Sequence, residues 1–137
     1  MPLPTAHEAI INLMVITSAS DRDMTDVELA RIGEVVKTWP IFTDFDQNEL
    51  LKAAQDCQAQ LQKKGGLNKV LTEAAQAVPV HLHDTAYAVA FEVAAVDLEM
   101  RMEEARIMQM LRSHLEVEPE ICTAIERAAK ARHRMLA

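Results

Sequence analysis

The 137-residue sequence has little of what loop-rich, all-β or disulfide-linked proteins require. It contains three glycines, five prolines and few aromatic residues (three Phe, one Trp and one Tyr). Two cysteines, Cys57 and Cys122, form no Cys-x-x-Cys motif, so we expect both to be small core residues in a reducing compartment. No run reaches the ~18 apolar residues of a membrane-spanning helix, and the N-terminus lacks the basic start of a signal peptide. These absences favour a cytoplasmic, helical protein.

Basic residues are also in the minority, with 14 Lys and Arg against 21 Asp and Glu and a formal net charge of −7. An acidic surface repels phosphate backbones and anionic lipids, so we expect neither a nucleic-acid partner nor a membrane. A basic stretch near the end, with Arg127, Lys130, Arg132 and Arg134, is typical of the last turns of a helix, as are His114 and His133.

What the sequence does contain is helix-forming residues in helical spacing. It predicts an all-α, single-domain bundle of about seven helices over residues 1–137 and no strand. Residues 5–19 and 84–96 are apolar on nearly every side, which predicts two central helices packed on each other. Thr25 and Glu28 form a capping-box pattern that begins a helix ending before Trp39. The other expected helices cover 46–64, which begins at an Asp46 cap and is closed by Gly65-Gly66, then 67–78, 102–114 and 118–134.

A weak internal repeat links the two apolar segments. Residues 17–28 align with residues 93–104 at a constant offset of 76 positions. Each copy has an apolar helix, an Asp, a short turn, and a Glu on the first turn of an amphipathic helix. The identical pairs are Ala19 and Ala95, Asp21 and Asp97, Met24 and Met100, and Glu28 and Glu104. Duplicated helix pairs usually pack about a pseudo-twofold axis, which would bring the two acidic turns together.

This duplicated arrangement resembles the tellurite-resistance TerB family of bacterial all-helical domains, over nearly the whole chain. The resemblance implies a non-enzymatic module of tellurite and chemical-stress response that binds a divalent cation through paired acidic motifs, with a protein partner as a further expectation. Those motifs fall here on Asp21, Glu28, Asp97 and Glu104. Ca²⁺ is the first choice because carboxylates on flexible turns suit its variable coordination. The simpler interpretation, solvated turn acids with Glu28 serving only as a cap, stays open, and the oligomeric state is undetermined.

Two other interpretations use different residues. His83-Asp84, with His7 and Asp97, could supply ligands for a metal-dependent phosphohydrolase; the simpler expectation is that Asp84 caps a helix while His81 and His83 are exposed. An EF-hand beginning at Asp21 is excluded because its sixth position would be Asp26 instead of Gly.

Methionine is frequent, with eight residues. Thioethers could bind a soft metal, but their helical spacing favours flexible packing in the core.

Overall fold

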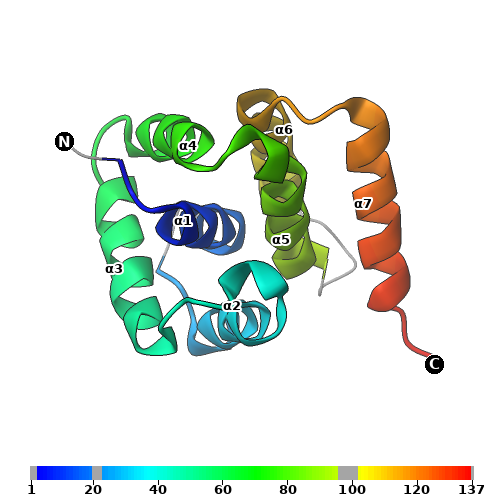
Figure 1. Ribbon diagram of the computed structural model, residues 1–137, viewed down its shortest axis with the longest axis horizontal. Coiled ribbons are helices and arrows are strands. Elements are labelled where there is room, and N and C mark those ends of the chain that lie inside the picture. The colour runs from blue at the N-terminus through cyan, green and yellow to red at the C-terminus, as the bar shows by residue number, and fades with distance from the viewer. Residues whose placement is uncertain (1–2, 20–22, 96–101, 137) are drawn as a thin grey trace.

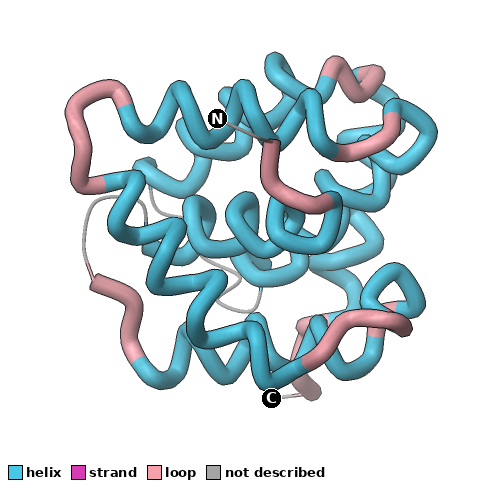
Figure 2. The backbone as a smooth tube through the Cα atoms, turned by 60° about the vertical axis from the view of Figure 1, so that its left-hand side comes forward, coloured by secondary structure: helices cyan, strands magenta, loops and turns pink. Residues whose placement is uncertain are grey.

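The computed structural model describes residues 3–19, 23–95 and 102–136, and this part of the chain contains helices and no strand (Figures 1 and 2). The all-α prediction is therefore confirmed. The helices are α1 (Ala6–Ala19), α2 (Asp26–Thr38), α3 (Leu50–Leu61), α4 (Gly66–Ala77), α5 (His83–Ala95), α6 (Met102–Leu115) and α7 (Pro119–Arg132). Short 3-10 turns, η1 (Pro40–Phe42), η2 (Gln47–Glu49) and η3 (Val80–Leu82), lie between them. None of the described helices combines the length and the hydrophobicity needed to cross a membrane.

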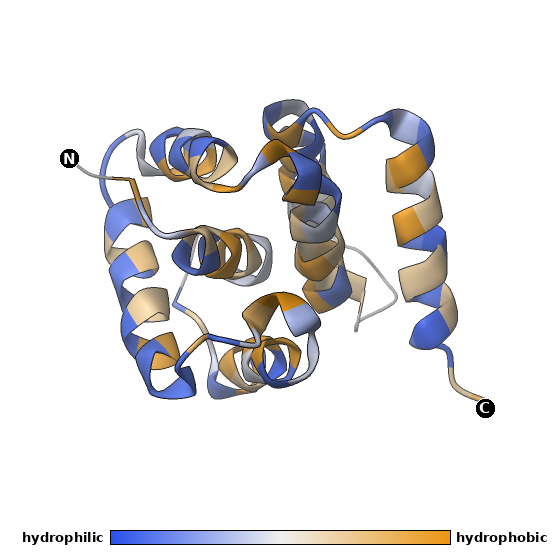
Figure 3. Ribbon diagram, in the orientation of Figure 1, coloured by the Kyte–Doolittle hydropathy of each residue, from blue (hydrophilic) through white to orange (hydrophobic). Residues whose placement is uncertain are grey.

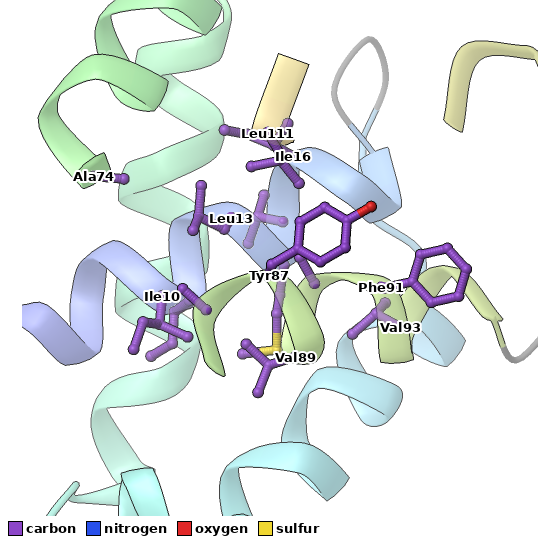
Figure 4. Packing of buried hydrophobic residues seen from close by; sticks show 14 of the residues in the cluster. Ile10, Leu13, Ile16, Ala74, Tyr87, Val89, Phe91, Val93 and Leu111 are labelled. Atoms are coloured by element: carbon purple, nitrogen blue, oxygen red, sulfur yellow. The ribbon is translucent and has the colours of Figure 1, made fainter. Parts of the chain in front are cut away.

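The two helices that are apolar on every side, α1 and α5, form the centre of the molecule. They share the most extensive helix–helix contact of the fold, as predicted. α1 also packs on α3 and α4, and α5 on α6 and α7 (Figure 1). Ile10, Leu13 and Ile16 of α1 lie opposite α5 in the core (Figure 4). Neither helix has a polar face, because neither meets water over most of its length.

Helix α2 begins and ends where local chemistry requires. The Thr25 hydroxyl accepts a hydrogen bond from the Glu28 amide at 3.1 Å, and the Glu28 carboxylate accepts one from the Thr25 amide at 2.9 Å. This reciprocal capping box was predicted and is confirmed. At the other end Trp39 is extended, as the residue before a proline prefers, and α2 stops at Thr38.

The third helix differs from the prediction at its start. Asp46 accepts a hydrogen bond from the Asn48 amide at 3.0 Å and begins the 3-10 turn η2, so α3 itself starts only at Leu50. After α3, Gly65 adopts the left-handed conformation with φ 72°, as the Gly-Gly pair predicted. Gly66 is needed for space: a Cβ there would lie 2.0 Å from the Gln60 carbonyl oxygen.

The helix bounds follow the repeat offset. Shifting α1 and α2 by 76 positions gives 82–95 and 102–114, which nearly coincide with α5 and α6. α2 contacts α5 and α6 contacts α1, the reciprocal pattern that a twofold relation requires. The repeat itself stays a prediction, because Asp21, Asp97 and Met100 lie outside the described residues.

Two histidines 76 positions apart make matching contacts in the two halves. His7 Nε2 lies 2.8 Å from the Ile41 carbonyl oxygen, just after α2. His83 Nδ1 lies 2.9 Å from the Leu115 carbonyl oxygen, at the end of α6. Each histidine therefore joins the start of a central helix to the end of its amphipathic partner.

Both cysteines and two of the methionines lie in the hydrophobic core. Cys57 and Cys122 are buried free thiols, and Met14 and Met108 are buried in the same cluster. The core prediction is confirmed for these four residues, whereas Met24 and Met110 are partly buried and Met135 is exposed. Burial raises the pKa of the Cys57 thiol to about 12, so it is an unreactive thiol at neutral pH.

Candidate cation site and its surroundings

Of the four acidic residues predicted to bind a cation, the structure describes the side chain of Glu28 alone. Asp21 and Asp97 lie outside the described residues. Glu104 lies in the first turn of α6, but its side chain is outside what the structure describes. Glu28 is described, and its Oε1 caps α2 through the amide and the hydroxyl of Thr25. The predicted cluster thus stays a prediction, with the capping role of Glu28 established.

Two helices that flank the predicted site lie together. A groove of about 500 Å³ is lined by α2 along its length, from Val27 to Thr38, by Glu92 and Val93 near the end of α5, and by His133. Val27 immediately precedes Glu28, and Val93 stands four positions before Asp97. Helix α2 is therefore a neighbour of the last turns of α5.

No group of three or more His, Cys, Asp or Glu side chains among the described residues is arranged to hold a metal ion. An acidic cleft of about 290 Å³ was not anticipated from the sequence. Its lining includes Glu8, Asp44, Asp46, Glu49 and Asp56. These acids come from three separate stretches of chain, so no local spacing signalled the cleft.

The expectation that His83 is exposed is wrong. His83 is half-buried, and its Nδ1 and Nε2 each lie 2.9 Å from a carbonyl oxygen, those of Leu115 and Val78 respectively. The turn η3 directs the ring inward, toward the ends of α4 and α6. A metal could bind His83 only by displacing one of these two carbonyl oxygens from its ring nitrogen. His81 is exposed, as expected, and Asp84 accepts a hydrogen bond from the Thr85 amide at 2.7 Å.

A buried polar network between α5, α6 and α7 was missed in the sequence. The Tyr87 hydroxyl, on a fully buried residue, donates to Glu126 at 2.5 Å and accepts from Arg112 Nε at 3.0 Å. Arg112 also forms an ion pair with Glu126. Burial, followed by the hydrogen bond to Glu126, raises the pKa of Tyr87, so the phenol keeps its proton. The signal was the single tyrosine of the sequence, placed in a helix that is apolar on nearly every side, since a buried hydroxyl requires a partner.

A second network explains part of the basic C-terminal stretch. Glu92 of α5 is nearly buried and accepts hydrogen bonds from Arg132 at 3.0 and 3.3 Å and from His133 at 2.8 Å. The sequence attributed these two basic residues to the helix terminus alone. In the structure they also neutralise a specific carboxylate and fix the end of α7 against α5.

Two buried central helices, each flanked by amphipathic helices, define a class of compact all-α module. The protein-family model described as Tellurite resistance protein TerB matches residues 7–127, from the start of α1 into α7. The chain therefore belongs to the TerB family and is a tellurite-resistance-like module. No curated protein and no solved structure matches the chain.

Proposed function

We propose that this TerB-family protein is a non-enzymatic module that binds a divalent cation, Ca²⁺ first, through Asp21, Glu28, Asp97 and Glu104. The observation that supports it most is the contact between α2 and the last turns of α5. Asp21 stands five positions before the start of α2, and Asp97 stands two positions after the end of α5. The chain therefore has little length over which to separate the two acidic stretches.

The physical argument rests on charge. Carboxylates brought together without a cation repel one another, and a hard cation such as Ca²⁺ removes that repulsion by coordinating their oxygens. A ligand that binds only the folded state stabilises it by RT ln(1 + [L]/Kd), about 2.7 kcal/mol at a hundredfold excess over Kd. Cation binding should therefore be visible as a rise in melting temperature.

The test compares Asp97→Asn with Asp26→Asn, an acidic residue in the first turn of α2 outside the proposed set. Millimolar Ca²⁺ should raise the melting temperature of the parent and of Asp26→Asn but not that of Asp97→Asn. Asp97→Asn should leave the cation-free stability equal or higher, because it removes a repelled charge. A parent melt that Ca²⁺, Mg²⁺ and Mn²⁺ all leave unmoved would contradict the proposal and favour a module that binds only a protein partner.

We further propose a cytoplasmic role in chemical-stress response, with a partner protein that recognises the cation-bound form. Nucleic acid is not the partner, since a net charge of −7 opposes approach to a phosphate backbone. A mobility-shift assay at ~0.15 M salt should show no micromolar binding of duplex DNA. Such binding, lost on neutralising Arg127, Lys130, Arg132 and Arg134, would contradict this part.

The metal-dependent phosphohydrolase built on His83-Asp84 is not the function we propose, because both ring nitrogens of His83 face carbonyl oxygens. A phosphoesterase screen with Mn²⁺ or Mg²⁺ provides the direct check. Turnover that disappears in His83→Ala but persists in His81→Ala would reverse this choice.

A further inference from the structure

A cavity of about 310 Å³ lies between α5, α6 and α7, and its lining differs from that of the groove between α2 and α5. Its size falls at the lower end of the range for small-molecule sites, roughly 300–1,000 Å³. The floor is apolar and buried, and the rim, apart from one alanine, is polar. Phe91, Ala94, Ala95 and Met108 form the floor, and Ala105, Gln109, Arg112, Glu126 and Lys130 form the rim.

Arg112 is held in place before any ligand arrives. Its Nε donates to the Tyr87 hydroxyl and its Nη2 pairs with Glu126. These hydrogen bonds, that to Tyr87 first, raise the pKa of the guanidinium, so the group stays charged. A guanidinium has five N–H donors, and these two bonds leave others available at the cavity rim. A fixed donor group loses little freedom on binding, which favours affinity.

Lys130 adds a second cation to the same rim. Its side chain is exposed and forms no hydrogen bond or ion pair with the described residues. With Arg112, Lys130 and Glu126, the described rim has a net charge of +1, although the whole chain carries −7. A positively charged rim favours an anionic ligand group, and an apolar floor favours a ligand with a hydrophobic part.

We propose that this cavity binds a small amphipathic carboxylate, an organic acid whose carboxylate lies on Arg112 and Lys130 and whose apolar body covers Phe91 and Met108. Arg112 suits a carboxylate because its planar fork matches the two oxygens. Tyr87 and Glu126 are positioning residues that hold the guanidinium. The site adjoins the proposed cation site, since Ala105 follows Glu104, but it shares no residue with it. Its test is run without divalent cations, so either proposal can fail without the other.

Octanoate is the probe, measured by titration calorimetry in a buffer containing EDTA so that no divalent cation contributes. We expect saturable 1:1 binding. Burying a methylene contributes about 0.8 kcal/mol, so each one removed should weaken binding about fourfold and hexanoate should bind about fifteenfold more weakly. Octanol should bind at least tenfold more weakly than octanoate. Equal binding of octanol, or binding that does not saturate, would overturn the proposal.

Matched variants locate the site. Lys130→Gln should weaken octanoate about threefold, whereas Arg127→Gln, on the same helix but outside the cavity lining, should change nothing. Arg112→Gln should weaken it tenfold or more, with Arg106→Gln of α6 as the control. Because Arg112→Gln also disturbs the Tyr87 network, Ala105→Leu gives an independent check: it fills the cavity rim from an exposed position and should abolish binding. Undiminished binding in Ala105→Leu would overturn the proposal whatever the stability of Arg112→Gln.

Discussion

The outer helices α3 and α7 each bury one alanine and one cysteine, but they are held to the central helices by different interactions: α3 by apolar packing, and α7 also by hydrogen bonds and ion pairs. α3 buries Ala54 and Cys57 on the α1 side, and α7 buries Ala129 and Cys122 on the α5 side. Around these, α3 adds Leu50, Ala53 and Leu61 as partly buried apolar contacts. α7 adds Ile125, together with the polar networks through Glu126 and Arg132. In Figure 3 the hydrophobic positions of α7 alternate with hydrophilic ones.

The difference originates in the central helices. In α1 the buried polar residue Thr17 is satisfied within its own helix, since its hydroxyl donates to the Leu13 carbonyl at 2.8 Å. In α5 the side chains of Tyr87 and Glu92 have their partners on other helices. A buried polar group without a partner is costly, so α5 requires α7 to be present and correctly placed. The α1 side should therefore respond mainly to changes in packing, and the α5 side also to changes in charge.

The largest effect should come from Val89→Asp, which breaks both sides at once. Val89 is fully buried in α5, and an unpaired charge there should lower the free energy of unfolding by more than ~3 kcal/mol. Urea denaturation measures this loss. The control is Val80→Asp in η3, at a side chain that is 82% exposed, where we expect a change within ~0.5 kcal/mol. Equal effects of the two variants would mean that α5 is not the core of the molecule.

An intermediate effect is expected from Glu92→Gln, which should loosen α7 and leave α3 intact. Losing the charge-assisted bonds to Arg132 and His133 should cost about 1–2 kcal/mol, because Arg132 is half-exposed and screened. Amide hydrogen exchange should accelerate in the last turns of α7.

The control for Glu92→Gln belongs to α3. Its ion pair, Lys52 with Asp56, is 3.3 Å long but exposed on both sides, so Asp56→Asn should change stability by less than ~0.5 kcal/mol. If Asp56→Asn destabilised the protein as much as Glu92→Gln, the two attachments would not differ in kind.

The smallest effect concerns the apolar contact between α3 and α1. Burial raises the Cys57 pKa from 9.0 to about 12, so the folded state keeps its proton where the unfolded state releases it. The resulting stability is fully present below pH 9 and is lost as the pH rises toward 12. Between pH 8 and 10 the parent should lose about 1 kcal/mol more than Cys57→Ala. An identical pH dependence of the two proteins would show that water reaches the Cys57 thiol.

The sequence predicted those features that depend on neighbours along the chain. Apolar residues on every side marked α1 and α5, and the capping box of Thr25 and Glu28 marked the start of α2. It missed the partners of Tyr87 and Glu92 because these stand 39 and 40 residues away, and helical periodicity carries no information on which polar side chains meet. The orientation of His83 was wrong for the same reason. The cation site stays a prediction, since Asp21 and Asp97 lie outside the described residues.

The turn at Gly65 and Gly66 sets a limit on how this sequence can vary. A side chain at 66 would overlap the Gln60 carbonyl, whereas a Cβ at Gly33 would meet only Leu50 at 3.7 Å, an ordinary contact. In a saturation library selected for folding, position 33 should accept alanine, while position 66 should return glycine alone. Gly33 and Gly66 therefore differ in their information content, and position 66, unlike position 33, marks the close α3–α4 turn in a diverging lineage.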